Sequence, residues 1–148
     1  MDERERRKEE NRIVAEKLLD YPYMVERYRE ALDEVAFALC DGRDGVHAGV
    51  SDPTAARAIR LEKLVGDLPR WIACVEAAQS VYRSKQKKLL AMRQEFARKP
   101  TDRIGWIDYV QGRWVQEYGK LPHRQMLFAI WRNMVDICAR IAAKKRLI

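Results

Sequence analysis

Apolar residues recur at three- and four-residue steps along most of this chain, which is the period of amphipathic helices. Residues 2–19 are rich in helix formers, although their apolar positions begin only at Ile13. Tyr21-Pro22 predicts a break, because proline disfavours the helical conformation in the residue before it. A second helix is expected after it, with these apolar positions: Met24, Tyr28, Ala31, Leu32, Val35 and Leu39.

The middle of the chain predicts one loop and one long helix. Residues 41–52 read DGRDGVHAGVSD and have no apolar period, so we expect a loop there. Ser51-Asp52-Pro53 begins a helix, because an oxygen-bearing side chain caps a first turn and proline suits that turn. The apolar period continues to Phe96, and Gly66 with Pro69 predicts a kink within a single helix over 51–99.

Two helices joined by a tight turn are predicted in residues 100–148. Lys99-Pro100 closes the long helix, and the next helix is expected over residues 103–117. Gly119 suits a left-handed helix exit, and Pro122 opens a final helix that reaches residue 146. The predicted fold class is all-α: a helical bundle with a long kinked central helix and a C-terminal helix-turn-helix. Its three parts are the N-terminal helices (1–50), the connecting helix (51–99) and the helix-turn-helix (100–148).

The composition adds the expected environment of the chain. No apolar run among the 148 residues approaches the roughly 20 residues that span a bilayer. The first residues lack the apolar core of a secretory signal, so a cytoplasmic location is expected. Three widely spaced cysteines (Cys40, Cys74 and Cys138) favour reduced thiols in the core. The four tryptophans also fall on apolar faces: Trp71, Trp106, Trp114 and Trp131.

The net charge of +7 is distributed unevenly along the chain. Residues 83–148 carry sixteen Lys and Arg against five Asp and Glu, a net charge of +11, whereas residues 13–50 carry −4. Clustered cations favour a polyanionic partner, because a phosphate backbone releases counterions when they bind. The long helix is expected to expose a basic face near its end: Arg83, Lys85, Lys87, Lys88 and Arg93.

Catalytic and metal-binding patterns are missing from the sequence. His47 lies in the glycine-containing loop and His123 at a helix start, and neither has a partner fixed by spacing. Asp41, Asp44 and Asp52 lack the oxygen spacing of a calcium loop. No HExxH, CxxC or phosphate-binding glycine loop occurs. We therefore expect no enzyme, no catalytic residue, no metal and no cofactor.

The segment IGWIDYVQGRWVQEYGKLPHRQMLFAIWRNMVDICARI has the parts of a helix-turn-helix: a supporting helix, a turn with Gly119 and a second amphipathic helix. The second helix is expected to bury Leu127, Ile130, Trp131, Met134, Cys138 and Ile141. Its open side then carries the predicted base readers, His123, Arg124, Gln125 and Arg132. Phosphate contacts are assigned to Lys120, Lys144, Lys145 and Arg146. The alternative interpretation is an ordinary helical hairpin.

Three segments of the chain resemble the phage-encoded ArpU/RinA-like transcriptional regulators, whose ends are similar to region 4 of sigma factors. They are LLDYPYMVERYREAL, GVSDPTAARAIRLEKL and the helix-turn-helix that begins at Gly105-Trp106. The supporting helix and turn are several residues longer here, and Pro122 replaces a small hydroxyl cap. The resemblance implies activation of late phage genes.

These observations predict a sequence-specific DNA-binding transcriptional regulator of phage or prophage late genes. Its partner would be double-stranded DNA, and the acidic N-terminal helices would form a homo-oligomer, with a dimer favoured, or contact RNA polymerase. One alternative is a small-terminase-like DNA-packaging protein, which predicts a ring of subunits. Another is a helical protein–protein adaptor without salt-sensitive DNA affinity.

Overall fold

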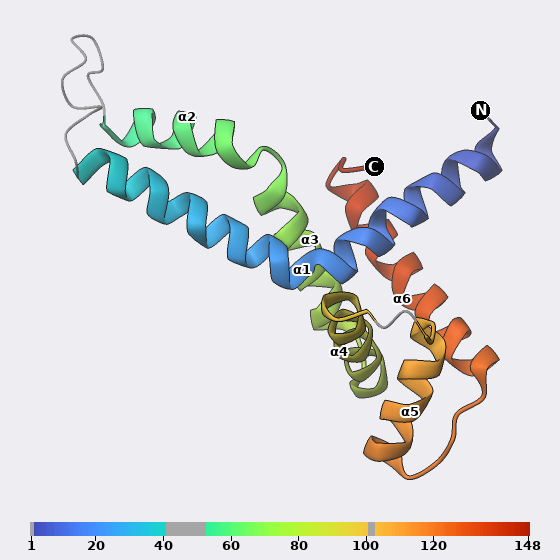
Figure 1. The fold of residues 1–148 in the computed structure, drawn as a ribbon. Helices are drawn as coiled ribbons and strands as arrows, with labels where there is room; N and C mark the ends of the chain where they lie inside the picture. Colours follow the sequence, from blue (N-terminus) through green and yellow to red (C-terminus); the bar gives the residue numbers. More distant parts are fainter. Residues whose placement is uncertain (1, 41–52, 101–102) are drawn as a thin grey trace.

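The structure, a computed structural model, describes residues 2–40, 53–100 and 103–148 (Figure 1). These ranges contain no strand and are built from α1 (Glu3–Cys40), α2 (Pro53–Val65), α3 (Leu68–Val81), α4 (Ser84–Arg98), α5 (Trp106–Tyr118) and α6 (Arg124–Lys144). The all-α class is therefore confirmed. The predicted loop over 41–52, with His47 and its aspartates, lies outside the described residues.

Helix α1 continues through Tyr21-Pro22, so the predicted break at this position was wrong. Proline has no N–H to donate to the carbonyl four residues earlier, which here belongs to the buried Leu18. The side-chain amide of Gln94 in α4 donates to that carbonyl oxygen at 2.9 Å. The helix changes direction near its middle without leaving this acceptor unsatisfied (Figure 1).

The predicted single helix over 51–99 was also wrong, because this segment forms α2, α3 and α4. Gly66 has a φ of +56° and ends α2, and Pro69 lies in the first turn of α3. The second break was not predicted: Tyr82 and Arg83 are extended, with ψ angles of 141° and 168°. This conformation accompanies burial of Tyr82, whose hydroxyl donates to the Met134 carbonyl at 2.6 Å. Burial also raises the pKa of Tyr82 far above its ordinary value.

The main core is organised around α3, which packs against α1 and α6. Cys74 and Cys138 are fully buried and form no disulfide, with their Sγ atoms 3.9 Å apart, which confirms their predicted place in the core. The side chain of Cys40 lies outside the described residues. Trp71, Trp114 and Trp131 are buried, whereas Trp106 is only partly buried. No helix in the described ranges is long and apolar enough to cross a membrane.

The part of α1 after Pro22 (residues 23–40) and α2 form a two-helix hairpin, here called the arm, that projects from the core (Figure 1). Met24 belongs to the main core, and Ala31 and Val35 are the other buried side chains described in the arm's portion of α1. None of the described side chains of α2 is buried. The arm therefore leaves much of its apolar surface open.

Candidate nucleic-acid interface

Helices α4, α5 and α6 pack together into what we call the C-terminal unit. Within it, α5 ends at Gly119, which adopts the predicted left-handed conformation with a φ of +75°. The turn then passes through the buried Pro122, whose carbonyl oxygen accepts a hydrogen bond from Gln111 Nε2 at 3.1 Å. The second helix begins at Arg124, two residues later than predicted. The turn is thus tied to α5.

Arg93 holds the three helices of this unit together. Its guanidinium carbon lies 3.9 Å from the ring centroid of Trp106 in α5 and 4.3 Å from that of Trp131 in α6. Desolvation lowers the pKa of Arg93 to about 10, so the group remains cationic at neutral pH. The expectation that Arg93 lies on an exposed basic face was wrong, because stacking between two indoles compensates for the loss of hydration.

Other charged side chains of α4 and α5 contact each other. Lys88 Nζ lies 2.9 Å from Glu117 Oε1, and this contact raises the pKa of Lys88. Glu95 Oε2 lies 3.5 Å from an Arg113 guanidinium nitrogen. Lys85 lies over the ring of Tyr118, 5.9 Å from its centroid. Part of the +11 charge therefore joins two helices of the unit.

Five of the predicted contact residues are exposed in the turn before α6 or in the first half of that helix: Lys120, His123, Arg124, Gln125 and Arg132. Arg124 is partly engaged, because its Nη1 lies 3.6 Å from Asp108 Oδ1 of α5. Arg132 forms no ion pair with any residue that the structure describes. His123, Gln125 and Arg132 are therefore the predicted base readers that no ion pair with a described residue occupies.

Phe128 lies on the same face and was not predicted from the sequence. It is 40% exposed, and its ring meets Trp106 edge to face at 5.3 Å between centroids. Together with Gln125, Trp131 and Arg132 it lines a shallow depression on the surface of α6. The spacing of residues 125, 128 and 132 could have identified it, because three- and four-residue steps share one helical face.

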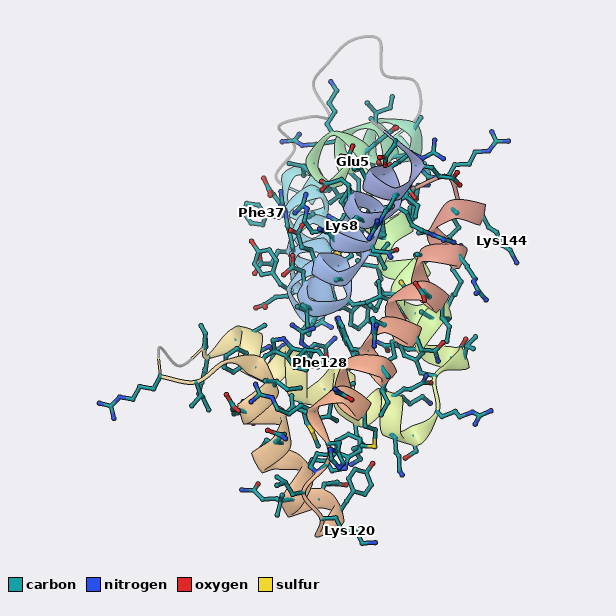
Figure 2. The ribbon with its side chains drawn as sticks, turned by 90° about the vertical axis from the view of Figure 1, so that its right-hand side faces the viewer. Glu5, Lys8, Phe37, Lys120, Phe128 and Lys144 are labelled. Carbon is teal, nitrogen blue, oxygen red and sulfur yellow. The ribbon has the colours of Figure 1, made fainter. Side chains whose placement is uncertain are left out.

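Lys144, Lys145 and Arg146 lie at the other end of α6 from this face. Twenty helical rises separate Arg124 from Lys144, which is about 30 Å, and Figure 2 shows Lys120 and Lys144 far apart. Arg146 adopts a left-handed φ of 57°, and the Leu147 N–H donates to the Ala142 carbonyl at 2.9 Å. The structure therefore divides the predicted contact residues into two separate groups.

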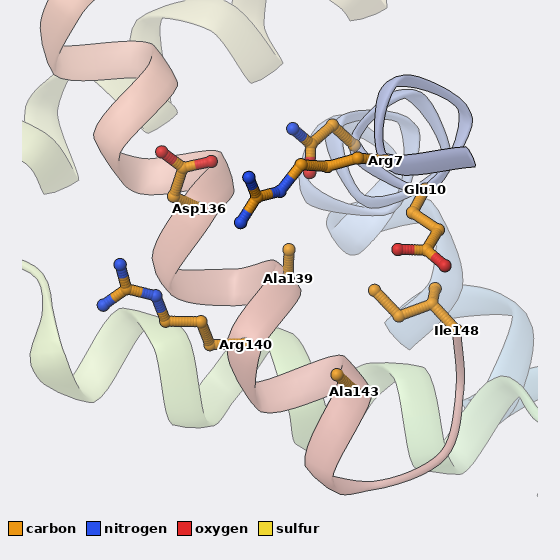
Figure 3. A pocket seen from close by; sticks show the side chains of 8 residues that line it. Arg7, Glu10, Asp136, Ala139, Arg140, Ala143 and Ile148 are labelled. Atoms are coloured by element: carbon orange, nitrogen blue, oxygen red, sulfur yellow. The ribbon is translucent and has the colours of Figure 1, made fainter. Parts of the chain in front are cut away.

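The second half of α6 is flanked by the first turns of α1. A depression between the two helices is lined by Arg7, Glu10, Asn11, Asp136, Ala139, Arg140, Ala143 and Ile148. Figure 3 shows the Arg7 side chain extending toward α6 near Asp136. A duplex that lay along this face of α6 would meet α1 here, so this face is open only in the first half of α6.

Among the residues that the structure describes, no three His, Cys, Asp or Glu side chains gather as metal ligands. Comparisons of the chain with protein-family models, curated protein sequences and solved structures found no match.

Proposed function

We propose that this protein is a sequence-specific DNA-binding regulator of phage or prophage late genes, acting in the cytoplasm of a bacterial host. The observation that carries the proposal is the face of α6 formed by Gln125, Phe128 and Arg132, which is open while the opposite face is buried. Helix-turn-helix proteins place such a face in the major groove. The regulatory role rests on the family resemblance.

The chemistry of this face fits base edges. Gln125 can form two hydrogen bonds with adenine, Arg132 can form two with guanine, and the exposed edge of Phe128 can contact a thymine methyl group. Lys120 and His123 precede the helix and are exposed, so they are suited to flanking phosphates. The positive end of the α6 dipole lies at the same place and favours an anion.

Selection of bound duplexes from a random pool tests the proposal directly, because a regulator enriches one site. We expect Arg124→Ala with Gln125→Ala to weaken binding to the selected duplex about tenfold or more. The same pair should change binding to unrelated duplexes much less. Arg4→Ala, an exposed cation in the first turns of α1, is the control and should leave affinity unchanged. Fluorescence anisotropy gives these affinities.

A second variant separates phosphate contacts from base reading. Replacing Lys144, Lys145 and Arg146 with Ala should weaken all duplexes alike and reduce the dependence of affinity on salt. If no duplex is enriched, the proposed sequence-specific regulator is wrong. If low salt also reveals no affinity for any DNA, the nucleic-acid interface is wrong as well. A helical adaptor that binds an acidic protein would give that result.

A further inference from the structure

We infer that the arm is a dimerisation surface, and that its partner is the arm of a second copy of this chain related by a two-fold axis. This dimer does not depend on DNA binding, because the arm lies away from α5 and the first half of α6 (Figure 1). The molecular mass of the protein in solution without DNA therefore tests the dimer separately from the proposed function.

The arm exposes apolar side chains that its own two helices do not cover. Phe37 is 71% exposed and projects away from the ribbon (Figure 2). Ile59 is 56% exposed and Leu64 is 37% exposed, although both belong to the apolar period of α2. A 13-residue helix without a buried side chain among those described is only marginally stable on its own. Among the residues that the structure describes, no surface of the same chain covers these side chains.

The charges of the arm indicate what covers it. The portion of α1 over residues 23–40 contains four acids and two bases, whereas α2 contains three bases and one acid. The two helices thus carry net charges of −2 and +2. A foreign partner would need a surface of matching mixed sign, whereas a second copy already has one. A two-fold axis can place each α1 against the α2 of the other copy, twice over.

The acidic and basic residues occupy defined faces. Tyr23, Glu26, Glu30, Asp33 and Phe37 are all exposed and lie at three- and four-residue steps, so they share one face of α1. Glu26, Glu30 and Asp33 form no ion pair with any residue that the structure describes. On α2, Arg57 is exposed on the face of Leu64, seven residues before it, and Lys63 is exposed next to Leu64 in the sequence. When α1 of one copy packs against α2 of the other, acidic side chains can therefore meet basic ones while the exposed apolar side chains are covered.

Charge-reversal variants of the full chain test this pairing by light scattering after gel filtration at micromolar concentration. Wild type should have twice the mass of the 17.4 kDa chain. Variant A carries Glu26→Lys, Glu30→Lys and Asp33→Lys, and variant B carries Arg57→Glu and Lys63→Glu. In a dimer of variant A alone, or of variant B alone, like charges would face each other at both contacts between α1 and α2. Each variant on its own should therefore have the mass of one chain. An equimolar mixture of A and B restores opposite charges and should recover the two-chain mass.

Matched controls keep the result interpretable. Glu3→Lys with Glu5→Lys reverses exposed acids at the far end of α1 and should leave the two-chain mass unchanged. Phe37→Ser with Ile59→Ser removes apolar contact without changing charge and should raise the dissociation constant about tenfold or more. Circular dichroism verifies the helicity of every variant.

The outcomes that overturn the inference are distinct. A wild type of single-chain mass, or a mass of eight or more chains, excludes the two-fold dimer. If variants A and B each keep the two-chain mass on their own, α1 does not pair with α2 of the other copy. The same conclusion follows if both variants are helical but their mixture does not recover the two-chain mass. If A or B loses helicity, an unchanged dissociation constant for Phe37→Ser with Ile59→Ser overturns the inference.

Discussion

The arm and the C-terminal unit have similar sequence patterns but bury them to very different extents. In α6, Leu127 and Trp131 conform to the apolar period and are buried. In α2, Ile59 and Leu64 conform to the same kind of period and are exposed. Two packed helices share a single interface, which leaves most of each helix surface exposed. Three packed helices enclose a space between them in which side chains are buried. An apolar period therefore identifies a surface to be covered, but not the chain that covers it.

The largest expected effect comes from one apolar truncation in each region. Leu127→Ala should lower the free energy of unfolding by about 2–5 kcal/mol, because the side chain is fully buried in the C-terminal unit. Phe37→Ala should change it by less than about 0.5 kcal/mol in the single chain. Urea denaturation at concentrations where both variants are single chains measures the difference. Equal losses would mean that the arm has a core of its own.

Arg93, stacked between two tryptophans, provides a second test of the packing of the C-terminal unit, with a smaller expected effect. Arg93→Ala should lower the free energy of unfolding by about 2 kcal/mol, because it removes contacts with both Trp106 and Trp131. Arg98→Ala is the control from the same helix and should cost about 0.5 kcal/mol or less, since Arg98 is exposed. Thermal unfolding of the two variants measures these values. A similar small cost for both would show that stacking does not join the three helices.

The smallest expected effect concerns the place where α1 leaves the core and enters the arm. Gln94→Ala should cost about 1–2 kcal/mol, because the Leu18 carbonyl then loses its donor. Pro22→Ala supplies a backbone N–H for that carbonyl, so Gln94→Ala should cost less in that background. A double-mutant cycle should give a coupling of about 0.5 kcal/mol or more. A coupling of zero would show that Gln94 does not compensate for the proline.

Sequence patterns predicted the structural elements that are determined by residues close together in the chain. The helical class, the left-handed Gly119 and the buried stripe of Leu127, Trp131, Met134 and Cys138 result from period and turn chemistry. The breaks have other causes. Pro22 is compatible with a helix because a residue 72 positions later supplies the missing donor, as the Gln94 contact shows. The extended Tyr82 accompanies a hydrogen bond to α6 that no local pattern contains.

Only part of the candidate contact face was predicted, because some of its contacts join residues that are far apart in the sequence. Period and charge selected Gln125 and Arg132, which the structure places on one open face. No local pattern indicated that Arg93 stacks between two indoles or that Asp108 holds Arg124, because both contacts join different helices. Residues 144–146 were grouped with the start of α6 by their charge, whereas a helix length separates the two. Their role in DNA binding stays a prediction.

Because α1 is one helix from the core to the arm, the arm is set at a fixed rotational phase. Every residue added to an α-helix rotates all later residues by about 100° and advances them by about 1.5 Å. An insertion after Pro22 would therefore aim the arm's acidic face in another direction even if every side chain were retained. The number of residues between Pro22 and the arm's acidic face therefore sets the direction in which that face points.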